Sequence, residues 1–81
     1  MPHISVKMFT GQSEQRKAEL AVEIGKTVIA VLGASSDSVS VSIEDVAPEN
    51  WATDVYKPEI IDKSQTVYRK PGYNPFEGSR D

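Results

Sequence analysis

The stretch from Ser13 to Gly33, SEQRKAELAVEIGKTVIAVLG, decides the fold because it has the pattern of one long amphipathic helix. Its apolar side chains recur every three or four residues with charged side chains between them, so one face can pack against a sheet. These apolar positions are Leu20, Ala21, Ile24, Val28, Val31 and Leu32. Ser13 has the side chain of a helix N-cap, and Gly33 suits the left-handed conformation that ends many helices. We therefore predict a single α-helix between these two residues.

The segments before and after this predicted helix both have the alternating pattern of a β-strand. Residues 3–9 and residues 39–44 place apolar side chains at every second position, with polar ones between them. A strand, a helix and a second strand form a β-α-β unit, whose strands run parallel and whose crossover is right-handed. A two-stranded sheet with one helix cannot bury both faces or pair both edges. We therefore expect an α/β (α+β) fold in which a second copy of the chain completes a larger sheet.

After Pro48 the pattern weakens, and the apolar residues fit one or two short helices. Pro58 is expected either to break this helical run or to begin its second part in the first turn. The tail, residues 70–81, contains several prolines and glycines and few aliphatic residues. It predicts either an ordered arm on a partner or a loose end.

Composition excludes several classes of function. Nine lysines and arginines against twelve aspartates and glutamates give a net charge of -3, which does not attract nucleic acid or an anionic membrane. The absence of cysteine excludes disulfides, thiolate chemistry and cysteine zinc sites, and one histidine with scattered carboxylates predicts no metal site. The longest apolar run, Thr27 to Leu32, is too short to span a bilayer, and no segment has the pattern of a signal peptide. We expect a cytoplasmic protein without membrane or nucleic-acid partners.

Pro2 is the residue with the clearest chemical use. Methionine aminopeptidases remove Met1 when the next residue is small, and the product then begins with the secondary amine of a stiff ring. Because a strand follows directly, this amine can be held in a defined place. Desolvation or a nearby cation lowers the pKa of such an amine, which makes it a general base near neutral pH.

Three segments of the chain resemble the 4-oxalocrotonate tautomerase family. They are the start MPHI with its strand to Phe9, the helix entry TGQSEQRKAEL at residues 10–20, and the second strand SVSVSIEDV at residues 38–46. Two later segments, PENW at residues 48–51 and KPGY at residues 70–73, are similar to a longer, bacterial, phenylpyruvate-tautomerase-like subgroup. The resemblance implies a β-α-β protomer, assembled as a homodimer or hexamer, that uses its N-terminal proline as a proton shuttle without metal or organic cofactor.

For this chain the resemblance implies one tautomerase-like domain over residues 2–81. Its core is residues 2–57, and a C-terminal helical segment and tail follow at residues 58–81. Pro2 takes the catalytic role. The implied reaction is the enol–keto tautomerisation of a 2-hydroxy-dienoate or enolpyruvate-type acid, a small enol or keto acid.

The chain departs from the family at two positions. The family places an arginine just after the first strand, where this chain has Gln12, and another in the second strand, where it has Ser40. Those arginines hold the substrate carboxylate and polarise its carbonyl, which suits a planar bidentate donor. Gln12 and Ser40 are the expected substrate-binding residues here, and their neutral groups favour a monoacid or ketone-like substrate over a dicarboxylate. Trp51 is also expected to line the pocket, because the family has an aromatic wall there.

Other residue roles and two other functions stay open. His3 is expected to be an ordinary strand residue. Arg16 and Lys17 are expected to be solvated, although one of them can reach a substrate carboxylate across a subunit boundary. A protonated Pro2 suits a hydratase or dehalogenase relative acting on an unsaturated or halogenated acid. The missing arginines instead favour a non-enzymatic, homo-oligomeric binding module on the same scaffold.

Overall fold

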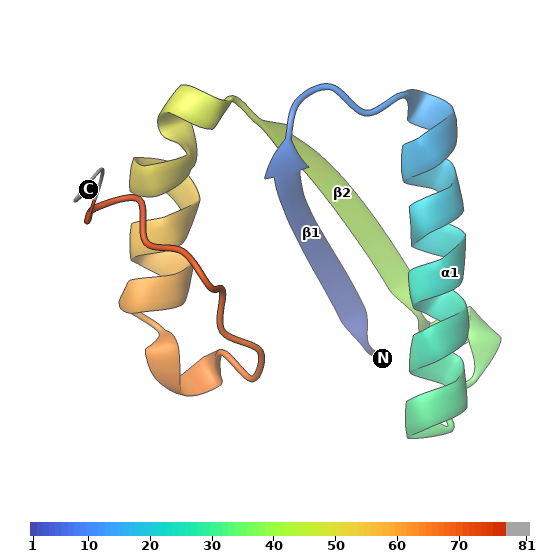
Figure 1. Cartoon of the computed structure of the whole chain (residues 1–81). Helices are drawn as coiled ribbons and strands as arrows, with labels where there is room; N and C mark the ends of the chain where they lie inside the picture. Colours follow the sequence, from blue (N-terminus) through green and yellow to red (C-terminus); the bar gives the residue numbers. More distant parts are fainter. Residues whose placement is uncertain (78–81) are drawn as a thin grey trace. The chain divides into compact units, whose positions relative to one another are not determined.

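The structure, a computed structural model, describes residues 1–77, and the chain divides into two units, residues 1–46 and 47–81. The first unit consists of strand β1 (His3–Phe9), helix α1 (Glu14–Leu32) and strand β2 (Ser40–Val46) (Figure 1). This order of strand, helix and strand confirms the predicted β-α-β fold.

Helix α1 begins and ends where its caps predict. The Ser13 Oγ accepts a hydrogen bond of 3.1 Å from the backbone N–H of Arg16. At the other end Gly33 adopts a φ of 70° and donates its N–H to the Ile29 carbonyl at 2.9 Å. Because both ends of α1 are satisfied by residues next to it in the chain, its length is fixed locally.

Strands β1 and β2 pair in parallel. His3 lies opposite Ser40 at one end of the ladder, and Phe9 lies opposite Val46 at the other. The connection from α1 contains one 3-10 turn, η1 (Ser36–Ser38). Helix α1 packs chiefly against β2, and Figure 1 shows it on the β2 side of the sheet. Strand β1 is therefore less covered by α1 than β2 is.

The two faces of the sheet differ in character. Val39 and Val41 share a hollow of about 380 Å³ with side chains of α1, which places the apolar face of β2 beneath the helix. On the opposite face the side chains of His3, Ser40 and Ser42 are exposed. This alternation between faces is what the period-2 pattern of the sequence predicts.

The first unit has no closed core. None of residues 1–46, all of which the structure describes, is fully buried. Apolar side chains of α1 stay exposed, with Val22 at 55%, Val31 at 75% and Leu32 at 66% of their full accessible surface. A sheet covered on one face by one helix thus leaves apolar surface for another element to cover.

The second unit is helical. It contains a 3-10 turn, η2 (Pro48–Asn50), a π-helix, η3 (Ala52–Ile61), and a 3-10 turn, η4 (Ser64–Thr66). Its core centres on Val55 and Tyr56, which are 6% and 7% exposed. Among the described residues, no helix of either unit is both long enough and apolar enough to cross a membrane.

The prediction for Pro58 is wrong, because this residue lies inside η3 and neither breaks it nor begins a second helix. In an α-helix its ring would collide with the carbonyl four residues earlier, that of Asp54. A π-helix bonds each N–H to the carbonyl five residues earlier, as in the 2.9 Å bond from Asp62 to Lys57. This wider backbone path is what allows proline in the middle of the element.

Residues 73–76 of the tail pack on their own chain and are not a loose end, whereas an arm on a partner stays a prediction. The ring of Tyr73 lies 5.4 Å from that of Tyr56, and the ring of Phe76 lies 6.0 Å from it. The Tyr56 hydroxyl donates to the Tyr73 carbonyl at 2.9 Å. These contacts hold residues 73–76 against η3, while residues 78–81 of the predicted tail lie outside the described part of the chain.

Candidate functional site

Pro2 stands at the entry to β1 and is half-buried. Its carbonyl accepts a hydrogen bond of 3.2 Å from the backbone N–H of Ser40, which continues the parallel ladder beyond the strand. Met1 precedes it, 88% exposed, and its terminal amine donates to the Ser38 carbonyl at 2.6 Å. The Pro2 nitrogen is an amide while Met1 is attached. The bond that fixes Pro2 uses its own carbonyl, so it does not depend on Met1.

Ser40 is hydrogen-bonded through its side chain to His3, its neighbour in register. The Ser40 Oγ lies 2.7 Å from Nδ1 of His3, and the Ser42 Oγ lies 3.5 Å from Nε2 of the same ring. A neutral imidazole has one donor and one acceptor nitrogen, so each nitrogen can pair with one hydroxyl. His3 is a strand residue, as expected, and its ring also bridges two serines of β2. This contact could be foreseen only with the strand register in hand.

Gln12 lies at the other end of β1, in the exposed connection to α1. It lines a hollow of about 210 Å³ together with Met8, Arg16, Lys17 and Leu20. The seven residues of β1 separate it from Pro2. At roughly 3.3 Å per residue this separation is about 20 Å or more. Gln12 and Pro2 of one chain therefore cannot both contact one small substrate.

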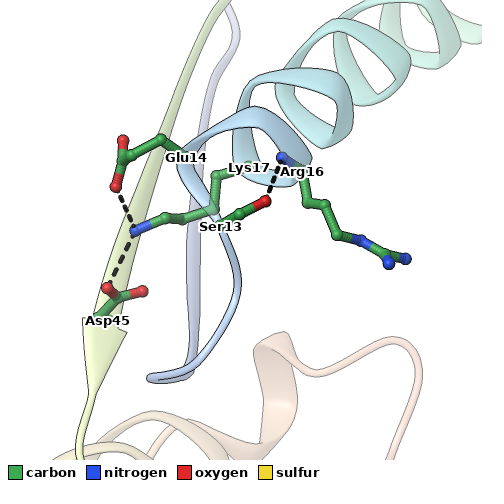
Figure 2. Close-up of polar contacts among 5 residues, drawn as sticks. All are labelled: Ser13, Glu14, Arg16, Lys17 and Asp45. Atoms are coloured by element: carbon green, nitrogen blue, oxygen red, sulfur yellow. Dashed lines mark hydrogen bonds and ion pairs between the residues drawn. The ribbon is translucent and has the colours of Figure 1, made fainter.

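Lys17, which shares this hollow, is held between two carboxylates (Figure 2). Its Nζ donates to Oδ2 of Asp45 at 2.9 Å and to Oε2 of Glu14 at 3.0 Å, and its side chain is only 15% exposed. These hydrogen bonds, that with Asp45 foremost, raise the pKa of Lys17 above its ordinary value. The ammonium group is thus a charged link between α1 and β2, and its protonation opposes a role as an amine nucleophile or base.

Trp51 belongs to the second unit, where it is the residue before η3 and is half-exposed. Its indole N–H donates to the Tyr73 hydroxyl at 2.8 Å. The tail therefore satisfies the polar edge of the indole. The role of Trp51 as a pocket wall stays a prediction.

The structure thus brings together two of the four residues that the sequence selects. Pro2 and Ser40 are joined by a backbone hydrogen bond. Gln12 lies at the far end of β1, and Trp51 lies in the second unit. The prediction that Arg16 and Lys17 are both solvated is wrong for Lys17, whose side chain is only 15% exposed and paired with two carboxylates. The acid three residues before Lys17, Glu14, was visible in the sequence, but Asp45 reaches Lys17 only through the fold.

The sequence over residues 2–58 matches a family described as Tautomerase enzyme. The chain belongs to the tautomerase family. The matched range includes Pro2, Gln12, Ser40 and Trp51, the four residues selected from the sequence.

Several bacterial tautomerases are similar to this one over almost their whole length. A probable tautomerase of Xylella fastidiosa strain 9a5c is 42% identical over 73 residues, which cover 90% of this chain and 89% of that protein. Tautomerase PptA of Cronobacter sakazakii is 39% identical over 74 residues, covering 90% of this chain and 97% of the relative. Tautomerase PptA of Escherichia coli strain SMS-3-5 is 36% identical over 75 residues, with 91% and 99% covered.

A solved structure shares the fold of this tautomerase. It is TomN, described as a 4-oxalocrotonate tautomerase homologue in the tomaymycin biosynthetic pathway. The two chains are 32% identical and superpose with a TM-score of 0.60 over 62% of this chain and 77% of TomN. Family, relatives and fold together identify the chain as an enzyme of the tautomerase type, an isomerase.

Proposed function

We propose that this tautomerase interconverts the enol and keto forms of a 2-hydroxy-dienoate or enolpyruvate-type acid, with Pro2 as the general base once Met1 is removed. The observation that carries the proposal is the anchoring of Pro2 at the head of β1 by the 3.2 Å bond from Ser40. A base must be held within reach of the proton it takes, and a ring fixed at a strand entry meets this need.

The proposed reaction moves one proton within the substrate. The neutral Pro2 amine takes the proton of the enol hydroxyl, and the electrons of that O–H bond form the carbonyl. The electrons of the carbon–carbon double bond then take the same proton from Pro2 at the carbon two atoms away from the oxygen. One O–H bond breaks and one C–H bond forms, so the base is regenerated and no oxidant or leaving group is involved.

The neutral residues at the two expected substrate-binding positions support a monoacid substrate. Ser40 offers one hydroxyl and Gln12 one amide, and neither is a bidentate cation of the kind that holds a second carboxylate. We therefore expect phenylenolpyruvate, with one carboxylate, to be converted better than 2-hydroxymuconate, with two.

We further propose that the active form is a homodimer or a larger homo-oligomer in the cytoplasm. The apolar surface that α1 leaves exposed and the open sheet edges support association. The distance between Pro2 and Gln12 along β1 also supports it, because only a second copy can place both groups on one substrate.

The test compares ketonisation of phenylenolpyruvate by the wild type and Pro2→Ala, with the mass of the mature protein measured first. The mass is expected to lack Met1, and the Pro2→Ala rate is expected to fall by about 100-fold or more. Pro48→Ala changes an exposed proline and serves as the matched control. Equal rates for wild type and Pro2→Ala, or full activity with Met1 retained, would rule out Pro2 as the base.

The pH profile separates the proposed base from the alternative acid. A tautomerase that uses neutral Pro2 loses activity as the pH falls below the pKa of the amine. A hydratase or dehalogenase that uses protonated Pro2 loses activity as the pH rises above that pKa. Indifference of every activity to Pro2 substitution would instead favour a binding module.

A further inference from the structure

Two adjacent basic residues line the Gln12 hollow, and only one of them is paired with carboxylates. Lys17 is neutralised by Asp45 and Glu14. The guanidinium of Arg16, which lines the same hollow and is exposed, makes no ion pair or hydrogen bond with any described residue. Figure 2 shows its side chain pointing away from both carboxylates. Among the arginines and lysines of residues 1–46, Arg16 is the one whose side chain has no ion pair or hydrogen bond in the part of the chain that the structure describes.

Local stability does not account for Arg16 in this place. Arg16 lies in the first turn of α1, where a positive charge opposes the positive end of the helix dipole. Two carboxylates near this end of α1, those of Glu14 and Asp45, are occupied by Lys17. A guanidinium that is charged, exposed and unpaired beside a hollow is available for an anion, and its planar fork matches a carboxylate.

We propose that Arg16 binds the substrate carboxylate, and that it acts on a substrate held by Pro2 of a second copy. This inference rests on the proposed function, which gives the substrate its carboxylate. Arg16 and Gln12 line one hollow, so a cation and an amide would meet the acid together. They take over the task of the arginines that Gln12 and Ser40 replace.

The second copy follows from the length of β1. Gln12 lies about 20 Å or more from Pro2 of the same chain, since each of the seven residues of β1 adds roughly 3.3 Å. Two copies related by a two-fold axis and paired through the β1 edge run antiparallel. The end of one β1 then lies beside the start of the other. Each of the two sites thereby combines one Pro2 with the partner copy's hollow.

The first test measures how Arg16→Gln changes ketonisation of phenylenolpyruvate and of its uncharged ethyl ester. We expect KM for the acid to rise about tenfold or more, because a charge-assisted hydrogen bond is lost, and KM for the ester to stay within about twofold. Arg16→Lys, which keeps the charge, should recover part of the loss. Lys26→Gln, which removes an exposed cation from the same helix, should leave both KM values unchanged.

The outcomes of this test separate two failures. If the wild type ketonises the acid but Arg16→Gln has the wild-type KM, the role of Arg16 is overturned and the role of Pro2 stands. If the wild type ketonises neither substrate, the proposed function fails and this inference fails with it. An equal rise in KM for acid and ester would also overturn the inference, because it would show a general disturbance of the site.

The second test asks which copy supplies Arg16. Pro2→Ala and Arg16→Gln proteins are unfolded together, mixed in equal amounts and refolded, and circular dichroism checks that each parent folds. In a dimer, half of the molecules are mixed, and one of their two sites has both Pro2 and Arg16. At substrate concentrations far below KM, about a quarter of the wild-type activity should therefore return. Activity no higher than the mean of the two parents would overturn the sharing of the site between copies.

Discussion

At the scale of single residues, Ser40 is bonded to Pro2 through its backbone and to His3 through its side chain. The Ser40 hydroxyl can donate once and accept twice, and Nδ1 of His3 at 2.7 Å uses one of these capacities. The bond to His3 fixes the orientation of the hydroxyl, and with it the direction of the hydrogen bonds that Ser40 can still make. We therefore expect His3 to act as a positioning residue, which turns the Ser40 hydroxyl towards the substrate without contacting the substrate itself.

This arrangement predicts a coupled pair of mutational effects. Ser40→Ala is expected to lower kcat/KM about fivefold, the effect of one neutral hydrogen bond, and His3→Ala to lower it by a similar factor. The double variant should be no worse than Ser40→Ala, because His3 acts through Ser40. Steady-state rates for the four proteins measure this coupling. Ser5→Ala, an exposed serine of β1, is the control, and losses that simply multiply would contradict the pairing.

At the scale of elements, Lys17 is the polar link between α1 and β2. Its two hydrogen bonds raise its pKa, so the folded state binds the lysine proton more tightly than the unfolded state does. The stabilisation is therefore complete at pH values below about 10.5, the ordinary value for lysine, and is lost as the pH rises through the raised value.

The difference in Tm between wild type and Lys17→Gln is the measurement that checks this link. We expect the variant to melt lower, with a constant difference from pH 7 to pH 9 that shrinks only in more alkaline solution. Lys26→Gln is the matched control, since its ion pair with Glu23 is 68% exposed on both sides and adds little. A difference that shrinks already between pH 7 and pH 9 would show that another group is responsible.

The contact between the tail and η3 is a second link between elements, and the fluorescence of Trp51 can be used to follow it. Tyr73→Phe keeps the ring against Tyr56 but removes the hydroxyl that accepts from the Trp51 indole. We expect a loss of about 1 kcal/mol in the free energy of unfolding and a shift in fluorescence of this single tryptophan. Tyr68→Phe removes a hydroxyl from a side chain that is 99% exposed and should change neither quantity. Identical behaviour of the two variants would contradict the role of this hydrogen bond.

At the scale of the whole molecule, the first unit leaves apolar surface exposed, and we expect another copy of the chain to cover it. The structure leaves Val31 and Leu32 mostly exposed and gives residues 1–46 no buried residue. Burial of such surface contributes roughly 25 cal/mol for each Å², so association and folding are expected to be coupled.

Coupled folding and association predicts a Tm that depends on protein concentration. Raising the concentration 100-fold should raise the Tm by several degrees, because the folded oligomer is favoured by mass action while the unfolded chain is monomeric. Calorimetry at several concentrations, with sedimentation to establish the mass, checks this. A monomeric mass with a constant Tm would contradict the oligomer and also the sharing of the site.

Features that depend on neighbours in sequence could be predicted from the sequence. The alternation of β1 and the caps of α1 involve residues a few positions apart, and both are confirmed. The π-helix around Pro58 could not be predicted, because the rule that excludes proline describes α-helical geometry. The aromatic contact of Tyr73 with Tyr56 joins residues seventeen positions apart, and no short-range pattern announces it.

In the candidate site, too, some features could be predicted from the sequence and others depend on the fold. Pro2 and Ser40 could be selected from the sequence, and the parallel register explains why they meet. The difference between Lys17 and Arg16 could not be foreseen, because it depends on Asp45, which reaches the helix from 28 residues away. By charge alone Lys17 and Arg16 are equivalent, but in the fold only Lys17 is paired with carboxylates.

The amide at Pro2 has a practical consequence for how the protein is prepared. Any residue placed before Pro2, such as a purification tag or the scar of a protease site, leaves the ring nitrogen acylated and unable to accept a proton. The anchoring bond from Ser40 to the Pro2 carbonyl would persist, so such a sample would be correctly folded and inactive. Activity should therefore be measured on protein that carries its purification tag at the C-terminal end. The mass of that protein should first confirm that the Pro2 amine is free.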